Sequence, residues 1–238
     1  MQFSAPIFRL KRQAKQLARE SGMPRHQALD HVARREGFRS WSHLASSAPY
    51  RTPAQAVLAQ CAPGDLVLLG ARPGQGKTLL GLALAVEAAR SGRPGYFFTL
   101  ADAESEVFQR LEALGIQRGG PGTPTLDTSD EICADHIVRR LDLSSRVPGP
   151  VVVVDYLQVL DQKRRHPDLS EQVARLKAFA SASGGVVVAI SQIDRAFDPS
   201  VKPLPDLSDV RLPNPLDLSM FTKACFLHAG EIALRAVA

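Results

Sequence analysis

Two patterns of apolar residues divide the chain near residue 50. Up to about residue 47 apolar residues recur at helical spacing, beginning with Ile7, Leu10, Ala14 and Leu17, and this spacing predicts two or three short helices around a small core. From about residue 54 short uninterrupted apolar runs alternate with longer amphipathic stretches. The apolar runs cover residues 66–69, 95–100, 150–154 and 185–190, and the amphipathic stretches cover 77–90, 103–114, 130–143 and 169–183.

The alternation predicts the fold class. Short apolar runs without polar interruption are typical of strands that are buried on both faces of a parallel sheet. Their repeated alternation with helices predicts a three-layer α/β domain with a mostly parallel central sheet. The tail differs, because segments 224–228 and 231–234 flank Ala229-Gly230 and predict a closing hairpin. We therefore expect a small basic helical module over residues 1–50 and the α/β domain over residues 51–238, joined by a linker rich in Ser and Pro.

Composition adds an uneven distribution of charge. The net charge of the 238 residues is +5, yet residues 1–51 hold ten Lys or Arg and three acids, and the remainder holds 19 basic and 21 acidic residues. Such a basic segment is either an arm for a polyanion or an ordinary solvated helical surface. With 45% hydrophobic residues the chain can bury a core, which excludes a disordered chain. No apolar run is long enough to span a membrane, and three dispersed cysteines favour a reducing cytoplasm.

The segment 65–80 carries the clearest chemical pattern, with a buried strand, a Gly-rich loop and a helix in that order. Its loop matches the spacing of a phosphate-binding P-loop, except that Ala stands at the first position. Glycines let successive backbone N–H groups point at phosphate oxygens, and the following helix adds its positive end. Lys77 would reach the β- and γ-phosphates of ATP, and the Thr78 hydroxyl would ligate Mg²⁺. The candidate ligands of the phosphates are Ala71, Arg72, Pro73, Gly74, Gln75, Gly76, Lys77 and Thr78.

A carboxylate follows another strongly apolar run. Four valines at 151–154 lead directly into Asp155, which the predicted sheet would place at its carboxyl edge. An isolated carboxylate is costly to bury, whereas Mg²⁺ with its bound waters offsets that cost. We therefore predict that Thr78 and Asp155 together hold the metal ion.

With these motifs the chain resembles the ATPase domain of DnaB-type replicative DNA helicases, within the RecA-like ATPases. The resemblance covers roughly residues 60–228 and implies a RecA-like fold, binding and hydrolysis of ATP, a role in DNA transactions in the cytoplasm and assembly into a homo-oligomer. It also implies that Gln192 senses the γ-phosphate or couples it to DNA-binding loops, and that two loops contact nucleic acid, most simply single-stranded DNA. The candidate contacts are Lys163, Arg164, Arg165 and Arg195. The matching segments are ARPGQGKT at 71–78, DYLQ at 155–158, LSEQVARLKAFA at 169–180 and VAISQIDR at 188–195, with a looser match at Asp209-Val210-Arg211.

The chain also departs from this family. Ala101 stands where the family has its catalytic Glu, and either Asp102 or Glu104 could substitute, Glu104 having the longer reach. The alternative for Glu104 is an exposed acid in the first turn of a helix, where the helix dipole favours it. Arg235 is the remaining candidate for the Lys-x-Arg finger that the family directs at a neighbouring subunit, and the alternative is an exposed strand residue. The resemblance leads us to expect the basic module in place of the family's large N-terminal collar.

Three functions follow from these observations. The first is an ATP-binding and ATP-hydrolysing domain that acts on DNA. The second is a nucleotide-gated regulator or adaptor with little hydrolysis and no unwinding, which Ala101 and the missing finger favour. The third is a small-molecule phosphotransferase, which ranks last because no segment resembles a lid over a phosphate acceptor.

Overall fold

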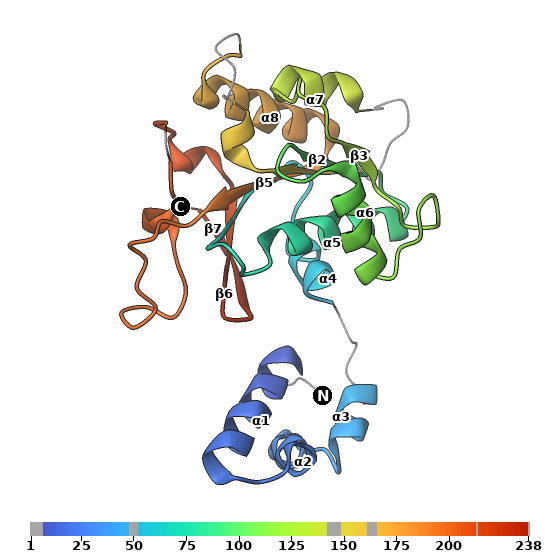
Figure 1. Ribbon diagram of the computed structural model, residues 1–238, viewed down its shortest axis with the longest axis vertical. Helices are drawn as coiled ribbons and strands as arrows, with labels where there is room; N and C mark the ends of the chain where they lie inside the picture. Colours follow the sequence, from blue (N-terminus) through green and yellow to red (C-terminus); the bar gives the residue numbers. More distant parts are fainter. Residues whose placement is uncertain (1–6, 48–51, 142–148, 161–165, 213, 238) are drawn as a thin grey trace. The chain divides into compact units, whose positions relative to one another are not determined.

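The chain forms two compact units, Met1–Thr52 and Pro53–Ala238 (Figure 1). The computed structural model describes residues 7–47, 52–141, 149–160, 166–212 and 214–237. None of the helices in these ranges combines the length and the apolar character that crossing a bilayer requires.

The first unit is a small helical module. Its core is made by residues from all three helices and the turn at Phe38, and Trp41 packs against this core. The Asp30 carboxylate accepts the backbone N–H of Trp41 at 2.8 Å and so satisfies one donor at the start of the third helix. The helices are α1 (Ile7–Ser21), α2 (Arg25–Arg35) and α3 (Trp41–Ser47). The buried residues are Leu10, Ala14, Ala28, Val32, Ala33, Phe38 and Leu44.

The second unit is built on a seven-stranded sheet in the order β3-β2-β4-β5-β1-β6-β7. Every neighbouring pair is parallel except β6 and β7, which form the predicted hairpin. Its turn residues, Ala229 at φ 48° and Gly230 at φ 80°, both adopt the positive φ of a tight hairpin turn. The strands are β1 (Leu66–Ala71), β2 (Gly95–Thr99), β3 (Thr125–Asp127), β4 (Val151–Asp155), β5 (Val186–Gln192), β6 (Lys223–His228) and β7 (Glu231–Ala236).

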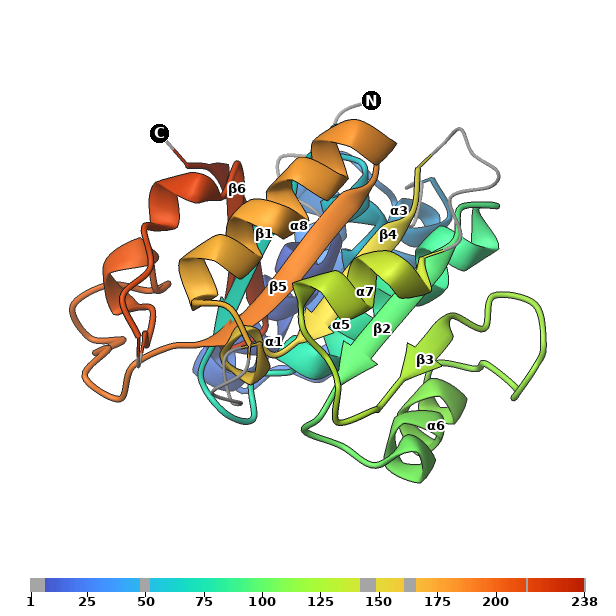
Figure 2. The same cartoon turned by 90° about the horizontal axis from the view of Figure 1, so that it is seen from above.

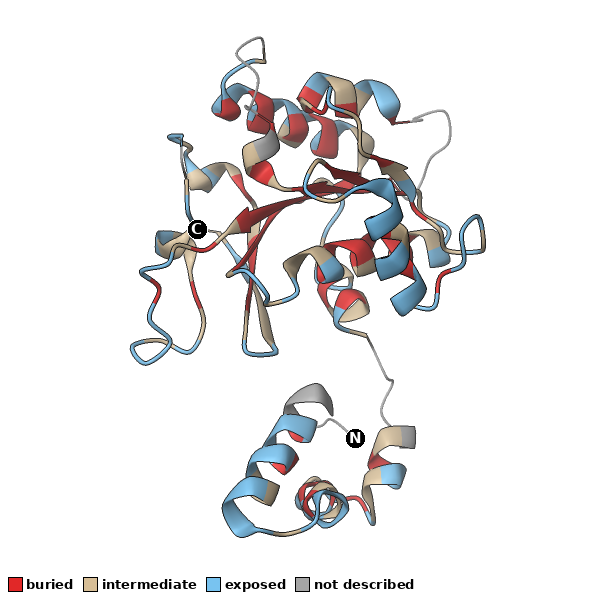
Figure 3. Cartoon of the chain, in the orientation of Figure 1, coloured by how far each residue is buried: buried red, intermediate tan, exposed pale blue. Residues whose placement is uncertain are grey.

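Helices cover both faces of this sheet and complete the predicted three layers. Figures 1 and 2 show α7 and α8 on one face and α4, α5 and α6 on the other. Successive residues of β1 alternate between the two cores, since Leu66 and Leu68 pack with α7 and α8 whereas Val67 and Leu69 pack with the opposite helices. Figure 3 shows the buried residues concentrated along the strands. The helices are α4 (Pro53–Leu58), α5 (Lys77–Arg90), α6 (Glu104–Ala113), α7 (Ala134–Arg140) and α8 (Leu169–Ser183), with 3₁₀ turns η1 (Leu157–Val159), η2 (Leu207–Asp209) and η3 (Leu218–Met220).

The packing of α5 against the sheet depends on close backbone approach. A Cβ atom at Gly95 of β2 would lie only 2.1 Å from the carbonyl oxygen of Ala85 in α5. A Cβ atom at Gly81 of α5 would lie 2.7 Å from Cδ1 of Ile190 in β5. Because α5 begins at Lys77, within the predicted phosphate loop, this tight packing fixes the loop relative to the strands.

Three local details differ from the sequence pattern. Strand β3 was not predicted, because it has three residues and buries only Asp127. The helix expected over 130–143 spans only Ala134–Arg140. Pro53 does not belong to the linker but begins α4, where a residue without an N–H costs the helix no hydrogen bond.

Candidate nucleotide site at the carboxyl edge of the sheet

The phosphate loop (residues 71–78) leaves the sheet between two neighbouring strands. Ala71 is the last residue of β1 and pairs in register with Gln192 of β5 and Leu227 of β6. Ala71 therefore has ordinary strand pairing on both sides, and the position needs no glycine although the P-loop pattern has one there. The glycine one residue earlier has a packing reason, because a Cβ at Gly70 would lie 2.9 Å from the ring of Phe226.

The two glycines inside the loop adopt left-handed backbone conformations. Gly74 has φ 76°, and Gly76, the N-cap of α5, has φ 86°. A Cβ atom at either glycine would meet no other protein atom within 4 Å, so the backbone conformation rather than protein crowding requires glycine here. The loop thus ends on the first turn of a 14-residue helix, whose free N–H groups and positive dipole end attract anions.

Asp155 ends β4 and is the most buried acid at this edge, with 1% of its surface exposed. The Thr78 hydroxyl lies beside this carboxylate and favours its charged form, yet Oδ2 has no hydrogen-bond partner among the described residues. Burial raises the pKa of Asp155, while the nearby Thr78 hydroxyl and the charge of Lys77 oppose that rise. The structure therefore brings Lys77, Thr78 and Asp155 together as the sequence predicts.

An unpartnered, buried carboxylate oxygen beside a hydroxyl is the kind of oxygen pair that suits Mg²⁺. In the part of the chain that the structure describes, no three His, Cys, Asp or Glu side chains gather in a way that could hold a metal ion. A metal held by Thr78 and Asp155 would therefore take its other ligands from the nucleotide and from water, which is the usual arrangement for Mg²⁺.

Asp102 and Glu104 are the two candidates for the role of the catalytic Glu, and their surroundings differ. Asp102 is 15% exposed, pairs with Arg110 of α6 at 3.0 Å, and its charge raises the pKa of Asp155. Glu104 is 54% exposed and pairs with Arg118 at 2.7 Å. Asp102 is therefore electrostatically coupled to the predicted metal site, whereas Glu104 forms a surface ion pair.

Gln192 lies at the end of β5, between the strands that carry Asp155 and the phosphate loop. The backbone carbonyl oxygen of Gln192 accepts the backbone N–H of Arg211 at 2.8 Å. The side-chain amide of Gln158 donates to the Ser191 hydroxyl at 3.1 Å and to the backbone carbonyl oxygen of Arg211 at 2.9 Å. These bonds tie η1 and the segment after β5 to the same sheet edge. The sequence analysis assigned no role to Ser191 or Gln158. A Ser that directly follows the apolar run 185–190 is the signal in the sequence that could have indicated Ser191, which is fully buried.

The candidate nucleic-acid contacts are described only in part. Lys163, Arg164 and Arg165 lie outside the described residues, and Arg195 is exposed. In the same segment as Arg195, Lys202 pairs with Asp206 at 2.7 Å and with Asp209 at 2.6 Å. Part of the positive charge of the segment after β5 is therefore neutralised by its own acids.

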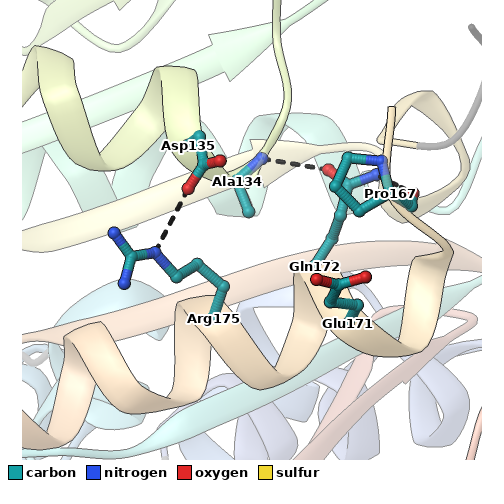
Figure 4. A pocket seen from close by; sticks show the side chains of 6 residues that line it. All are labelled: Ala134, Asp135, Pro167, Glu171, Gln172 and Arg175. Atoms are coloured by element: carbon teal, nitrogen blue, oxygen red, sulfur yellow. Dashed lines mark hydrogen bonds and ion pairs between the residues drawn. The ribbon is translucent and has the colours of Figure 1, made fainter. Parts of the chain in front are cut away.

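Gln172 of α8 has an exposed fraction of 1% and holds the segments before and after the candidate contacts at 163–165. Its amide nitrogen donates to the carbonyl oxygens of Leu160 and Pro167, and its amide oxygen accepts the N–H of Ala134 at 3.0 Å. Gln172 is one of the residues that line a pocket between α7 and α8, on the sheet face opposite α5 (Figure 4). Gln172 occupies the apolar stripe of α8, and a polar residue on such a stripe is the signal that sequence reasoning missed. The pocket is lined by Ala134, Asp135, Pro167, Glu171, Gln172 and Arg175.

The C-terminal hairpin touches the phosphate loop at its turn. The side-chain oxygen of Gln75 accepts the N–H of Ala229 at 2.7 Å. Arg235 is exposed on β7 and pairs with Ala224, which pairs in turn with Leu68 of β1. Along the strand direction, Arg235 therefore lies three residue positions, about 10 Å, from Ala71, the first residue of the phosphate loop.

Comparison with known proteins agrees with this geometry. Residues 126–215 match the family described as DnaB-like helicase C terminal domain. The replicative DNA helicases DnaB of Synechocystis sp. and Leifsonia xyli are each 28% identical, over 62% and 63% of this chain and 20% and 39% of their own lengths. The chain thus matches a fifth to two-fifths of these relatives.

Solved structures show the same fold. A DnaB-like replicative helicase, solved in a study of its interactions with primase, superimposes with a TM-score of 0.57 at 18% identity, covering 92% of this chain and 65% of that one. A KaiC-like protein from Pyrococcus horikoshii superimposes with a TM-score of 0.51 at 15% identity, covering 68% and 70%. The second unit is therefore a RecA-like P-loop domain that is similar to the ATPase domain of DnaB-type replicative DNA helicases.

Proposed function

We propose that the chain binds ATP with Mg²⁺ at the phosphate loop, hydrolyses the nucleotide and acts in DNA transactions. The observation that carries this proposal is the buried Asp155 carboxylate, which lies beside the Thr78 hydroxyl and a glycine loop that opens a helix. A buried acid with an unpartnered oxygen is costly unless a cation accompanies it. Similarity to DnaB helicases supports both the nucleotide and the DNA.

In this proposal the phosphate loop binds the nucleotide through backbone N–H groups directed by Gly74 and Gly76. Lys77 neutralises charge on the β- and γ-phosphates, and Thr78 and Asp155 hold Mg²⁺. The metal supplies further neutralisation of phosphate charge. Gln192 ends β5, the strand between Asp155 and the phosphate loop, and it reports the state of the γ-phosphate to the segment after β5. The hydrogen bond between its backbone carbonyl oxygen and the N–H of Arg211 links it to that segment.

For hydrolysis, Asp102 is the acid that the geometry favours to orient the attacking water. It lies close enough to Asp155 to affect its pKa, and Arg110 holds its carboxylate in place. Glu104, the longer side chain, would first have to release Arg118. Arg110 is then a positioning residue for Asp102.

A second candidate function is a nucleotide-gated regulator that binds ATP and hydrolyses it slowly. It is favoured by Ala101, which is exposed and lacks the carboxylate of the family. Both candidates include single-stranded DNA and further copies of the chain as proposed partners, with Arg235 as a candidate contact to a neighbouring subunit.

A steady-state ATPase assay on the full chain, with and without single-stranded DNA, separates the two candidates. The enzyme predicts turnover that requires Mg²⁺ and rises with DNA. Tight ATP binding with turnover no faster than that of Lys77→Ala supports the regulator instead. Absence of both binding and turnover contradicts both candidates.

A further inference from the structure

The first unit carries a regular cationic stripe on α1. Lys11, Lys15 and Arg19 follow one another at intervals of four residues and are all exposed, so they lie along one side of the helix. Leu10 and Ala14 on the same helix are fully buried in the core of the unit. The three cations make no ion pair with the described part of the chain. The helix thus uses its apolar side for folding and leaves its charge on the outside.

The acids of this unit offset little of that charge. Glu20 accepts a hydrogen bond from Gln16 at 2.8 Å, and Asp30 accepts the N–H of Trp41 at 2.8 Å. Residues 1–52 hold ten basic and three acidic side chains, a net charge of +7, whereas residues 53–238 have a net charge of −2. Long-range attraction for a polyanion therefore originates in the first unit.

The shape of the stripe indicates which polyanion fits. Its ends are eight residues apart, so the charges extend over about 12 Å of helix. A nucleic-acid strand offers phosphates at regular short intervals that such a row can contact in succession. A membrane surface fits poorly, because amphipathic helices bind lipid through an exposed apolar face. The only large exposed apolar side chains among the described residues are Leu79 and Val201, and both belong to the second unit.

We propose that the first unit is a nucleic-acid anchor that binds the phosphate backbone through Lys11, Lys15 and Arg19, whether or not ATP is present. This anchor is separate from the phosphate loop and from the candidate contacts at 163–165 and 195, and its failure would leave the proposed ATP site untouched. Recognition is electrostatic and independent of base sequence, because lysines and arginines in this row contact phosphates.

The test measures binding of the full chain, without nucleotide, to a fluorescent 20-nucleotide single strand and to the matching duplex between 50 and 200 mM KCl. The stripe variant combines Lys11→Gln, Lys15→Gln and Arg19→Gln, which keep good helix formers on α1. The control variant combines Arg90→Gln, Arg139→Gln and Lys177→Gln, which remove the same charge from the second unit. Circular dichroism and thermal melting check that both variants fold.

The anchor predicts that the stripe variant binds at least tenfold more weakly at 50 mM KCl, while the control stays within twofold of wild type. The slope of log affinity against log salt concentration should fall by about 2 for the single strand and by nearly 3 for the duplex. If the triple variant does not fold, Lys15→Glu alone should lower affinity and reduce the slope, with Lys177→Glu as its control.

Equal losses in the stripe and control variants would overturn the proposal, as would binding that appears only with ATP. So would equally tight binding of polyglutamate or of phosphatidylserine vesicles, because the stripe would then serve an acidic protein or a lipid surface. Tighter wild-type binding of the duplex than of the single strand at 50 mM KCl identifies double-stranded nucleic acid as the ligand, and the reverse identifies single strands.

Discussion

The two units use charge and burial in opposite ways. The second unit buries its decisive acid, Asp155, at the edge of a sheet whose four central apolar runs are covered on both faces. The described part of the first unit has a core of only seven buried residues, and the unit keeps its strong positive charge outside. A chemical site that depends on excluded water needs the large core, whereas attraction of a polyanion needs only a stable helix surface. The comparison predicts that a substitution in one unit impairs the binding function of that unit and leaves the function of the other unchanged.

The largest expected effect is that of Lys77→Ala. The ammonium group is the only cation within the helix-opening loop that the P-loop pattern directs at the β- and γ-phosphates. We expect ATP binding or turnover to fall by at least a hundredfold, which calorimetry and a steady-state ATPase assay measure. DNA binding by the first unit should persist in the same variant. Unchanged affinity and rate would remove Lys77 from the site.

Leu10→Ala tests the first unit in the same way. Leu10 is fully buried in a core with few other members, so its truncation should cost about 2–5 kcal/mol of that unit's stability. Hydrogen exchange should show loss of protection confined to residues 7–47, with weaker nucleic-acid binding and unchanged ATP affinity. Loss of protection in the sheet as well would show that the two units unfold together.

Asp102→Asn and Glu104→Gln form a matched pair within the second unit. If Asp102 orients the attacking water, its loss should lower kcat about 10- to 100-fold with little change in KM. Glu104→Gln removes only an exposed ion pair and should change kcat less than threefold. The opposite ranking would assign the role to Glu104, and no effect of either would favour the regulator.

The smallest expected effect is a gain of stability in Asp155→Asn. Burial raises the pKa of Asp155 above its ordinary value of 3.8, so the folded protein holds the ionised form at a cost. Without nucleotide and metal at neutral pH, the neutral amide should raise the free energy of unfolding by about 1 kcal/mol, seen as a higher Tm. The advantage should shrink as the pH falls through the raised pKa and vanish below 3.8, where the acid is protonated in both states. A lower Tm of the variant at neutral pH would contradict the cost of this charge.

Most of the fold could be predicted because the central strands are apolar on both faces. The runs at 66–69 and 150–154 need no knowledge of tertiary contacts, since only burial on both sides explains them. Strand β3 escaped prediction because it is short, lies at the sheet edge and takes its place from pairing with β2. Its residues carry no apolar pattern of their own.

The part of the candidate site that depends on the order of strands, loop and helix along the chain could be predicted. The P-loop spacing and the acid after the valine strand point to the same sheet edge, and the structure places Lys77, Thr78 and Asp155 there together. The choice between Asp102 and Glu104 could not be predicted, because it depends on which arginine each acid meets, eight or fourteen residues further along the chain. The contacts of Gln172 likewise depend on how α7 and α8 pack.

The most direct test of the account is a calorimetric titration of ATP into the full chain, once with Mg²⁺ and once with EDTA. If Thr78 and Asp155 hold the metal beside the phosphate loop, ATP should bind at least tenfold more tightly with Mg²⁺ in the wild type, and Asp155→Asn should lose that advantage. No heat of binding, or an affinity that Mg²⁺ leaves unchanged in the wild type, would contradict the proposed site.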